Sequence, residues 1–296
     1  GTRVPAFWQS PPWAELTAKY GSPLFVFSQP AIEEQFRRYR EAFAQHWPRT
    51  RWAWSYKTNY LPAICRLFHA AGAGAEVVSA MEFELAEALQ VPGEQIVFNG
   101  PHKPREALRR AVAAGGLVNV DHAAEIDDLA AIAEELGRTL KIGLRLNLNP
   151  ADSPWARFGF DVATGQALLA AEQIARQPRL QLTTLHTHLG TMIPKPGRYG
   201  SAVRRIGEFA KELRKRGVGQ IETLDLGGGF PSSILPLDGD DSWTAAPIEL
   251  YARDIAGAIA ASFPADDAPT LLLEAGRGLI DDAAVLVATV IGEKRL

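Results

Sequence analysis

The sequence predicts an α/β fold, a (β/α)8 barrel of the TIM type. Eight short β-rich runs alternate with segments whose apolar residues recur at helical spacing. Strands that alternate with helices are typical of parallel pairing through crossover connections. Eight strands close such a barrel, and the chain of 296 residues has room for its usual size of about 250 residues. The alternative fold is an open, doubly wound sheet.

The predicted barrel strands are short apolar runs that mostly end in a polar residue or a glycine. The first, at residues 51–57, alternates large aromatic residues with smaller ones. The next three are rich in valine, isoleucine or phenylalanine and lie at residues 75–79, 95–100 and 117–121. The last four are rich in leucine and lie at residues 141–147, 182–190, 221–227 and 270–276. Helices are predicted between them, at residues 81–90, 103–114, 122–136 and 202–216.

Two further β runs lie outside this set. Residues 21–28 precede the first barrel strand, and the β-branched run at residues 283–292 follows the last one. We therefore predict a barrel domain over residues 24–281. Residues 1–23 and 282–296 are predicted to be pieces of a second, β-rich domain, built from both termini and completed by a C-terminal domain absent from this chain.

The composition is that of an ordinary globular domain, with 47% hydrophobic and 22% charged residues. The net charge of −3 gives no reason to expect nucleic acid or an anionic membrane as a partner. A single cysteine, Cys65, excludes an internal disulfide and a cysteine-rich zinc site. Neither a membrane-spanning apolar run nor a signal peptide is recognisable, so we expect a cytoplasmic protein.

Side chains alternate along a strand, which predicts the residues that point into the barrel mouth. On the first strand Lys57 shares a face with the small residues Ala53 and Ser55. The same reasoning predicts these further inward residues: Val77, Ser79, Asn119, Asp121, Arg145, Asn147, His186, His188, Leu272 and Glu274. Active sites of such barrels lie at the carboxyl ends of the strands, so this polar group is the candidate site.

Three consecutive glycines, Gly227, Gly228 and Gly229, follow the seventh strand. Bare backbone at a tight turn is typical of phosphate binding, since exposed N–H groups form an anion-binding concavity. A lysine desolvated in an apolar barrel can form a Schiff base with an aldehyde. Pyridoxal 5′-phosphate carries both groups, so it would link Lys57 to the glycines, and Glu274 could pair with its pyridine nitrogen.

Four ordered motifs resemble the fold type III, alanine-racemase-like decarboxylases that use pyridoxal phosphate. They are YKTN, HTHLGT, LDLGGGF and EAGR, and the branch most similar to them contains diaminopimelate and ornithine decarboxylase. The resemblance implies that Lys57 forms the Schiff base, that His188 stacks on the ring and that Glu274 pairs with its nitrogen. It implies that these residues hold the phosphate or line the cofactor site: Thr191, Gly227, Gly228, Gly229, Gly276 and Arg277. Arg145 would lie near the cofactor.

The resemblance also implies the reaction and the assembly. The substrate would be diaminopimelate or a basic amino acid, which would lose CO₂, and the enzyme would be a homodimer with shared sites. The chain departs from the family pattern at Glu76, where an aspartate is usual, and at Ala275, where a proline is usual. A later cysteine segment and a later tyrosine that complete the site in this family have no match in this chain.

Three alternatives remain open from the sequence. An amino-acid racemase on the same barrel would use the same lysine. A protein that binds pyridoxal phosphate without full activity would follow from the lack of the C-terminal domain. A metal-dependent hydrolase would use the two histidines His186 and His188 with the inward Asp121. Against this last alternative, His186 is expected to be a hydrogen-bonded residue below the cofactor, and no metal is predicted.

Overall fold

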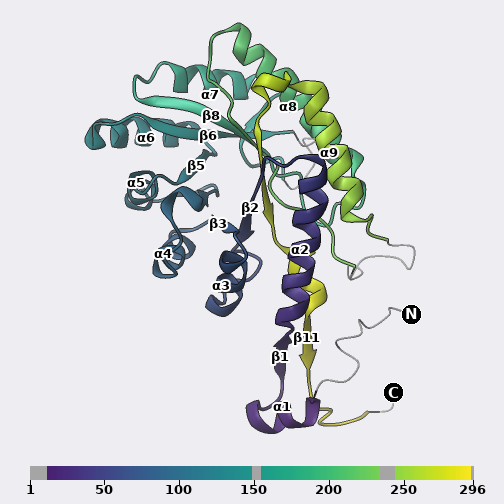
Figure 1. Cartoon of the computed structure of the whole chain (residues 1–296). Helices are drawn as coiled ribbons and strands as arrows, with labels where there is room; N and C mark the ends of the chain where they lie inside the picture. The colour runs from purple at the N-terminus through teal and green to yellow at the C-terminus, as the bar shows by residue number, and fades with distance from the viewer. Residues whose placement is uncertain (1–11, 149–154, 234–243, 295–296) are drawn as a thin grey trace.

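The computed structural model describes residues 12–148, 155–233 and 244–294. Eight parallel strands form a closed barrel within these residues (Figure 1). The barrel strands are β2 (Thr50–Ser55), β3 (Gly74–Val77), β4 (Ile96–Phe98), β5 (Leu117–Val120), β6 (Leu140–Asn147), β8 (Leu180–His186), β9 (Thr223–Asp225) and β10 (Thr270–Ala275). Each corresponds to one of the eight predicted runs, so the (β/α)8 prediction is confirmed and the open sheet is excluded.

Two pairings close the barrel. β10 pairs in parallel with β2, and β5 pairs in parallel with β6. A further two-residue strand, β7 (Phe160–Asp161), adds to the end of β6 and was not predicted. Its brevity explains this, because two residues carry no periodicity.

Helices surround the barrel and connect its strands (Figure 1). Their bounds are α2 (Gln29–His46), α3 (Pro62–Ala70), α4 (Ala80–Ala88), α5 (Arg105–Ala113), α6 (Ala123–Leu136), α7 (Gln166–Ala175), α8 (Gly197–Lys215), α9 (Ile248–Ser262) and the short α10 (Arg277–Ile280). Among the described residues, none of the helices combines the length and the apolar content that a bilayer crossing needs.

The apolar core has two parts of very different size. A large cluster fills the layer between strands and helices, where Trp54 stacks on Phe68 with ring centroids 3.8 Å apart. A small cluster inside the barrel contains Ala53, Val97 and Leu272. This confirms the predicted parity of the first and last strands, with aromatic residues outward and small or aliphatic residues inward. Polar side chains therefore occupy the interior beyond this thin apolar layer.

A second sheet lies apart from the barrel. β1 (Leu24–Phe27) pairs antiparallel with β11 (Ala284–Val287), and these two strands lie with α1 (Trp13–Tyr20) at one end of the molecule (Figure 1). The two terminal β runs thus contact each other. The predicted barrel boundary at residue 24 assigns β1 to the barrel, whereas its hydrogen bonds go to β11 instead. The division into domains otherwise stays a prediction.

Candidate active site

Two adjoining cavities open at the carboxyl ends of the strands. The larger, of about 400 Å³, is lined by all the residues predicted to bind the cofactor except Gly227 and Arg145. The smaller, of about 180 Å³, is lined by Arg145 and shares Lys57, Trp155, His188 and Glu274 with the larger one. The mouth therefore has two lobes, one bordered by glycine backbone and one by polar and aromatic side chains.

Lys57 follows the end of β2 and enters both cavities. Its Nζ lies 2.5 Å from Oε2 of Glu76 on β3. The lysine side chain is 43% exposed, whereas the Glu76 side chain is fully buried. The Glu76 carboxylate also accepts hydrogen bonds from Ser55 Oγ at 2.6 Å and Asn99 Nδ2 at 3.1 Å. A buried carboxylate that accepts several hydrogen bonds thus anchors the lysine head group at the mouth.

The prediction for β3 was wrong. Glu76, not Val77, faces the barrel interior, and Val77 packs in the outer apolar layer. Ser79 caps helix α4, where its hydroxyl accepts a hydrogen bond from the backbone N–H of Glu82. The adjacent residues Val77 and Val78 place one apolar side chain on each face of the strand, so alternation alone does not decide which residues point inward. The hydrogen-bond donors around Glu76 decide it, because a buried carboxylate needs them.

The three glycines form a tightly packed turn between β9 and the following segment. Gly227 and Gly229 have φ of +62° and +96°, a region that favours glycine. Their carbonyls point away into the protein: Gly227 accepts from Glu274 N, Gly228 from Tyr199 Oη and Gly229 from Ile193 N. A Cβ at Gly228 would overlap the Glu274 carbonyl oxygen, and one at Gly229 would overlap that of Gly190. Side chains are therefore excluded, and bare backbone borders the cavity.

His188 lies between the two cavities with its ring held on two sides. Gly228 N donates to its Nδ1 at 3.3 Å, which assigns the ring proton to Nε2. Trp155 contacts the ring edge-on, with centroids 5.4 Å apart. Burial, and next the nearby Lys57 charge, lower the pKa of His188 to about 3. The imidazole is therefore neutral at physiological pH.

This depressed pKa predicts an acid-sensitive fold. Above pH 6.5, His188 is neutral in both the folded and the unfolded protein. Between pH 6.5 and about pH 3, the unfolded chain binds a proton on His188 that the folded protein does not bind. His188 should thus reduce stability by up to about 1.4 kcal/mol per pH unit on acidification. When the pH is lowered from 6 to 4.5, the free energy of unfolding measured in urea should fall less for His188→Asn than for the wild type. His46→Asn, at an exposed position, is the control; equal slopes for all three proteins would contradict this.

Arg145 projects from β6 into the smaller cavity. Its guanidinium lies 4.8 Å from the centre of the Phe158 ring, and its Nη1 lies 3.4 Å from Oδ1 of Asp121. Arg277 lies at the rim of the larger cavity, where its Nε donates to Asp281 Oδ2 at 2.9 Å. Arg145 is largely buried and Arg277 is half exposed. The two cations border different lobes of the mouth.

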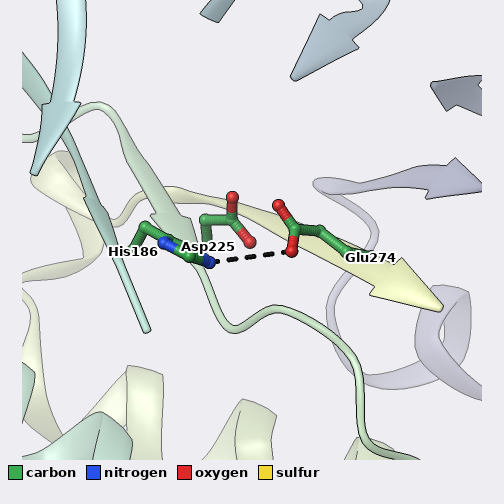
Figure 2. Close-up of side chains that lie close together, drawn as sticks. All are labelled: His186, Asp225 and Glu274. Atoms are coloured by element: carbon green, nitrogen blue, oxygen red, sulfur yellow. Dashed lines mark ion pairs between the residues drawn. The ribbon is translucent and has the colours of Figure 1, made fainter. Parts of the chain in front are cut away.

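A cluster of His186, Asp225 and Glu274 lies inside the barrel (Figure 2). The three groups come from β8, β9 and β10, and their nearest polar atoms all lie within 4.8 Å of one another. His186 Nε2 is 3.6 Å from Glu274 Oε2, and burial lowers the pKa of His186. Asn99 Nδ2 donates to Glu274 Oε1 at 2.6 Å, which ties the cluster to Glu76. A polar network thus runs from the interior to the lysine.

Sequence reasoning missed two members of this network. Asp225 and Asn99 were not predicted as site residues, although Asp225 has the inward parity of its strand and precedes the glycines. The hydrolase alternative had combined His186, His188 and Asp121. In the part of the chain that the structure describes, the one group with a metal-ligand arrangement contains His186 but neither of the others. Asp121 pairs with Arg145 instead, so the predicted ligand set is not assembled.

Comparison with known proteins gives consistent likenesses. Residues 29–281 match the family model of the pyridoxal-dependent decarboxylases, pyridoxal binding domain. Diaminopimelate decarboxylases of Methanocaldococcus jannaschii and Zymomonas mobilis are both 32% identical to the chain, over 93% and 95% of its length. The crystal structure of the M. jannaschii enzyme superposes with a TM-score of 0.82 and 30% identity over 92% of this chain. The chain spans 64–66% of the length of these relatives.

Proposed function

Because the chain belongs to the family of pyridoxal-dependent decarboxylases, we propose that it is the cofactor-binding part of an enzyme that removes CO₂ from diaminopimelate or another basic amino acid. The cofactor is pyridoxal 5′-phosphate. The observation that carries the proposal is a single cavity that holds both the Lys57 amine and the bare backbone of Gly228 and Gly229. The names of the similar proteins support diaminopimelate as the substrate.

The residues at the mouth fit this cofactor. Gly229 and Gly276 would hold the phosphate through their backbone, and Gly228, whose N–H donates to His188, would border it. An added Cβ at each of the three would overlap a neighbouring oxygen, so only bare backbone fits there. Gly227 supports this turn from beneath, through its carbonyl and its φ of +62°. Thr191 and Arg277 border the same cavity and would add a hydroxyl and a charge-assisted contact.

When bound, the cofactor accepts into its ring the electron pair that the departing CO₂ leaves on the substrate's α-carbon. Glu274 would hold a proton on the ring nitrogen, which increases the electron demand of the ring. The neutral His188 would lie flat against it and exclude water. Arg145 would border the ring end of the site. Lys57 would hold the cofactor's aldehyde group, and Glu76 would hold and orient the lysine head group.

We expect Glu76→Gln to lower kcat about 10- to 100-fold. The change removes a charge-assisted hydrogen bond worth about 1.5–3 kcal/mol while keeping the size of the side chain. Glu76→Asp, which retains the charge with a shorter reach, should lose less than the glutamine variant. CO₂ release and the absorbance of bound cofactor measure both effects. A glutamine variant as active as the wild type would show that the charge of Glu76 is dispensable.

The test of the proposed function uses the native full-length protein. A yellow preparation, loss of its visible absorbance on borohydride reduction, and a mass increase on the Lys57 peptide are expected. Incubation with diaminopimelate, lysine, ornithine and arginine should then release CO₂ from one of them. Inverted stereochemistry without CO₂ would favour the racemase alternative. Cofactor binding with no turnover on any of the four would favour the non-enzymatic one, and a colourless protein that takes up no cofactor would refute all three.

The assembly, the location and the domain division of the protein are three further proposals. We propose that the protein is cytoplasmic. We also propose a homodimer, since the Lys57 side chain is 43% exposed and Tyr60 and Leu61, which follow it, are about half exposed. A second subunit covering this mouth would exclude water from the reaction. We also propose that the β1–β11 sheet belongs to a β-rich domain distinct from the barrel. Light scattering, cell fractionation and limited proteolysis test these three statements.

A further inference from the structure

We propose that Asp225 is a protonated carboxylic acid that donates a hydrogen bond to Glu274 and, together with His186, positions that carboxylate as an anion. This inference deepens the proposed function and rests on it for its catalytic consequence. Asp225 and Glu274 lie on the neighbouring strands β9 and β10, and their carboxyl groups face each other inside the barrel (Figure 2). Asp225 would be a positioning residue, because it acts through Glu274.

The geometry of the pair favours one protonated and one ionised carboxyl group. Asp225 is fully buried and Glu274 is 3% exposed, and the nearest polar atoms of the two carboxyl groups and His186 all lie within 4.8 Å. Two anions this close in a low-dielectric interior repel each other strongly, and each has also lost its hydration. One of a pair of carboxyl groups in such a site therefore keeps its proton.

The surroundings place that proton on Asp225. Glu274 lines both cavities and has Lys57 beside it there, whereas Asp225 lines neither of the two. Burial, then the repulsion of Glu274, raise the pKa of Asp225 well above its usual value. Burial also acts to raise the pKa of Glu274, but His186, Lys57 and the hydrogen bond from Asp225 together lower it. The deeper group is thus neutral and the one at the cavity is charged.

The neighbouring hydrogen bonds are compatible with this state. Asp225 Oδ1 accepts from Gly227 N at 2.9 Å, and its Oδ2 accepts from Asn119 Nδ2 at 3.1 Å. Each oxygen keeps a second position, so a hydroxyl proton can point toward Glu274. The ionisable groups that face the pair are His186 on β8, Glu76 on β3, Arg145 on β6, Lys57 after β2 and His188 after β8.

The arrangement also links the two ends of the cofactor site. The carboxyl group that would hold Glu274 also accepts from Gly227, the first residue of the glycine turn. Asp225 therefore couples the position of the ring-binding carboxylate to that of the phosphate-binding backbone. Loss of its side chain should disturb both, whereas a neutral donor of the same size should keep both in place.

Infrared spectroscopy tests the protonation state directly, on the full-length protein with ¹³C-labelled aspartate and without added substrate. A protonated-carboxyl band that shifts with the label, persists at pH 8 and vanishes in Asp225→Asn is expected. The band should remain in Asp128→Asn, at an exposed position on α6. A spectrum with no such band, or a band that survives in Asp225→Asn, overturns the proposal whether or not the protein decarboxylates anything. One equivalent of tightly bound metal at this cluster also overturns it.

Enzyme kinetics test the consequence of this protonation state for the reaction. Asp225→Asn keeps a neutral donor, so it should lose about tenfold less in kcat than Asp225→Leu, which has a similar size and no donor. The leucine variant should also shift the pH profile of kcat and the visible absorbance of the bound cofactor. If kcat falls as far in the asparagine variant as in the leucine variant, Asp225 acts as an anion and the proposal fails. If neither wild type nor variants turn over, the proposed function fails while the infrared result still decides the protonation state.

Discussion

Lys57→Ala is expected to lower kcat by at least about 10³-fold, which corresponds to about 4 kcal/mol of transition-state stabilisation. The reason is that this amine is the group at the mouth that can bind an aldehyde, and Glu76 holds it beside both cavities. The fold should survive, since the side chain is 43% exposed and contributes little apolar packing. CO₂ release and the absorbance of bound cofactor measure the loss.

The matched control is Lys141→Ala. Lys141 lies on the same barrel but far from the mouth, in an exposed ion pair with Glu222. It should keep wild-type activity, because exposed pairs contribute about 0–1 kcal/mol. If Lys57→Ala still binds cofactor covalently or keeps more than about a tenth of the activity, another lysine carries the chemistry and the assignment of the site is wrong.

The second large effect is expected at the glycine turn. Gly229→Ala should weaken cofactor binding by at least about 10²-fold, or about 2.7 kcal/mol, and destabilise the fold by about 2–5 kcal/mol. The added Cβ would overlap the Gly190 carbonyl oxygen and lie 3.0 Å from Tyr199 Oη, at a φ of +96°. The backbone that borders the cavity would have to move. Cofactor titration and urea unfolding measure the two losses.

Gly115→Ala is a control that separates the effect of backbone strain from that of steric overlap by the added Cβ. Gly115 has a similar φ of +86°, but a Cβ there would meet nothing within 4 Å. It should destabilise the fold by only about 1 kcal/mol and leave cofactor binding intact. If Gly229→Ala behaves in the same way as this control, the close approach of the backbone at the turn has no role in binding.

Several features of the fold follow from local patterns in the sequence. The aromatic and small residues of 51–57 alternate strictly, so Trp54 and Ala53 were placed on the correct faces. The pattern failed at residues 75–79, where consecutive valines suit either face. β7 escaped detection because two residues have no period. These successes and failures share one cause: periodicity reports burial along a single element and carries no information about its neighbours.

Some residues of the candidate site could likewise be predicted from the sequence, and others could not. Lys57, the glycines and Glu274 stand out because their residue types and strand ends suggest chemistry on their own. Asn99 became visible only through its partners. Glu76 stood out in the sequence only as a departure from the family pattern, and its inward position follows from the donors that reach it, because a carboxylate is buried only where donors from other strands reach it. Asp225 gains its significance from one neighbour, a second carboxyl group on the adjacent strand.

By itself the sequence predicted eight parallel strands alternating with helices and most of the chemical groups gathered at the carboxyl ends of those strands. The tertiary structure decided the closure of the barrel and which of those groups lie close together: Lys57 with Glu76, Asp121 with Arg145, and Asp225 with Glu274. The physical reason is that folding preference follows the spacing of apolar residues along one strand, whereas charge and proton positions depend on distances of a few ångströms between strands far apart in the chain.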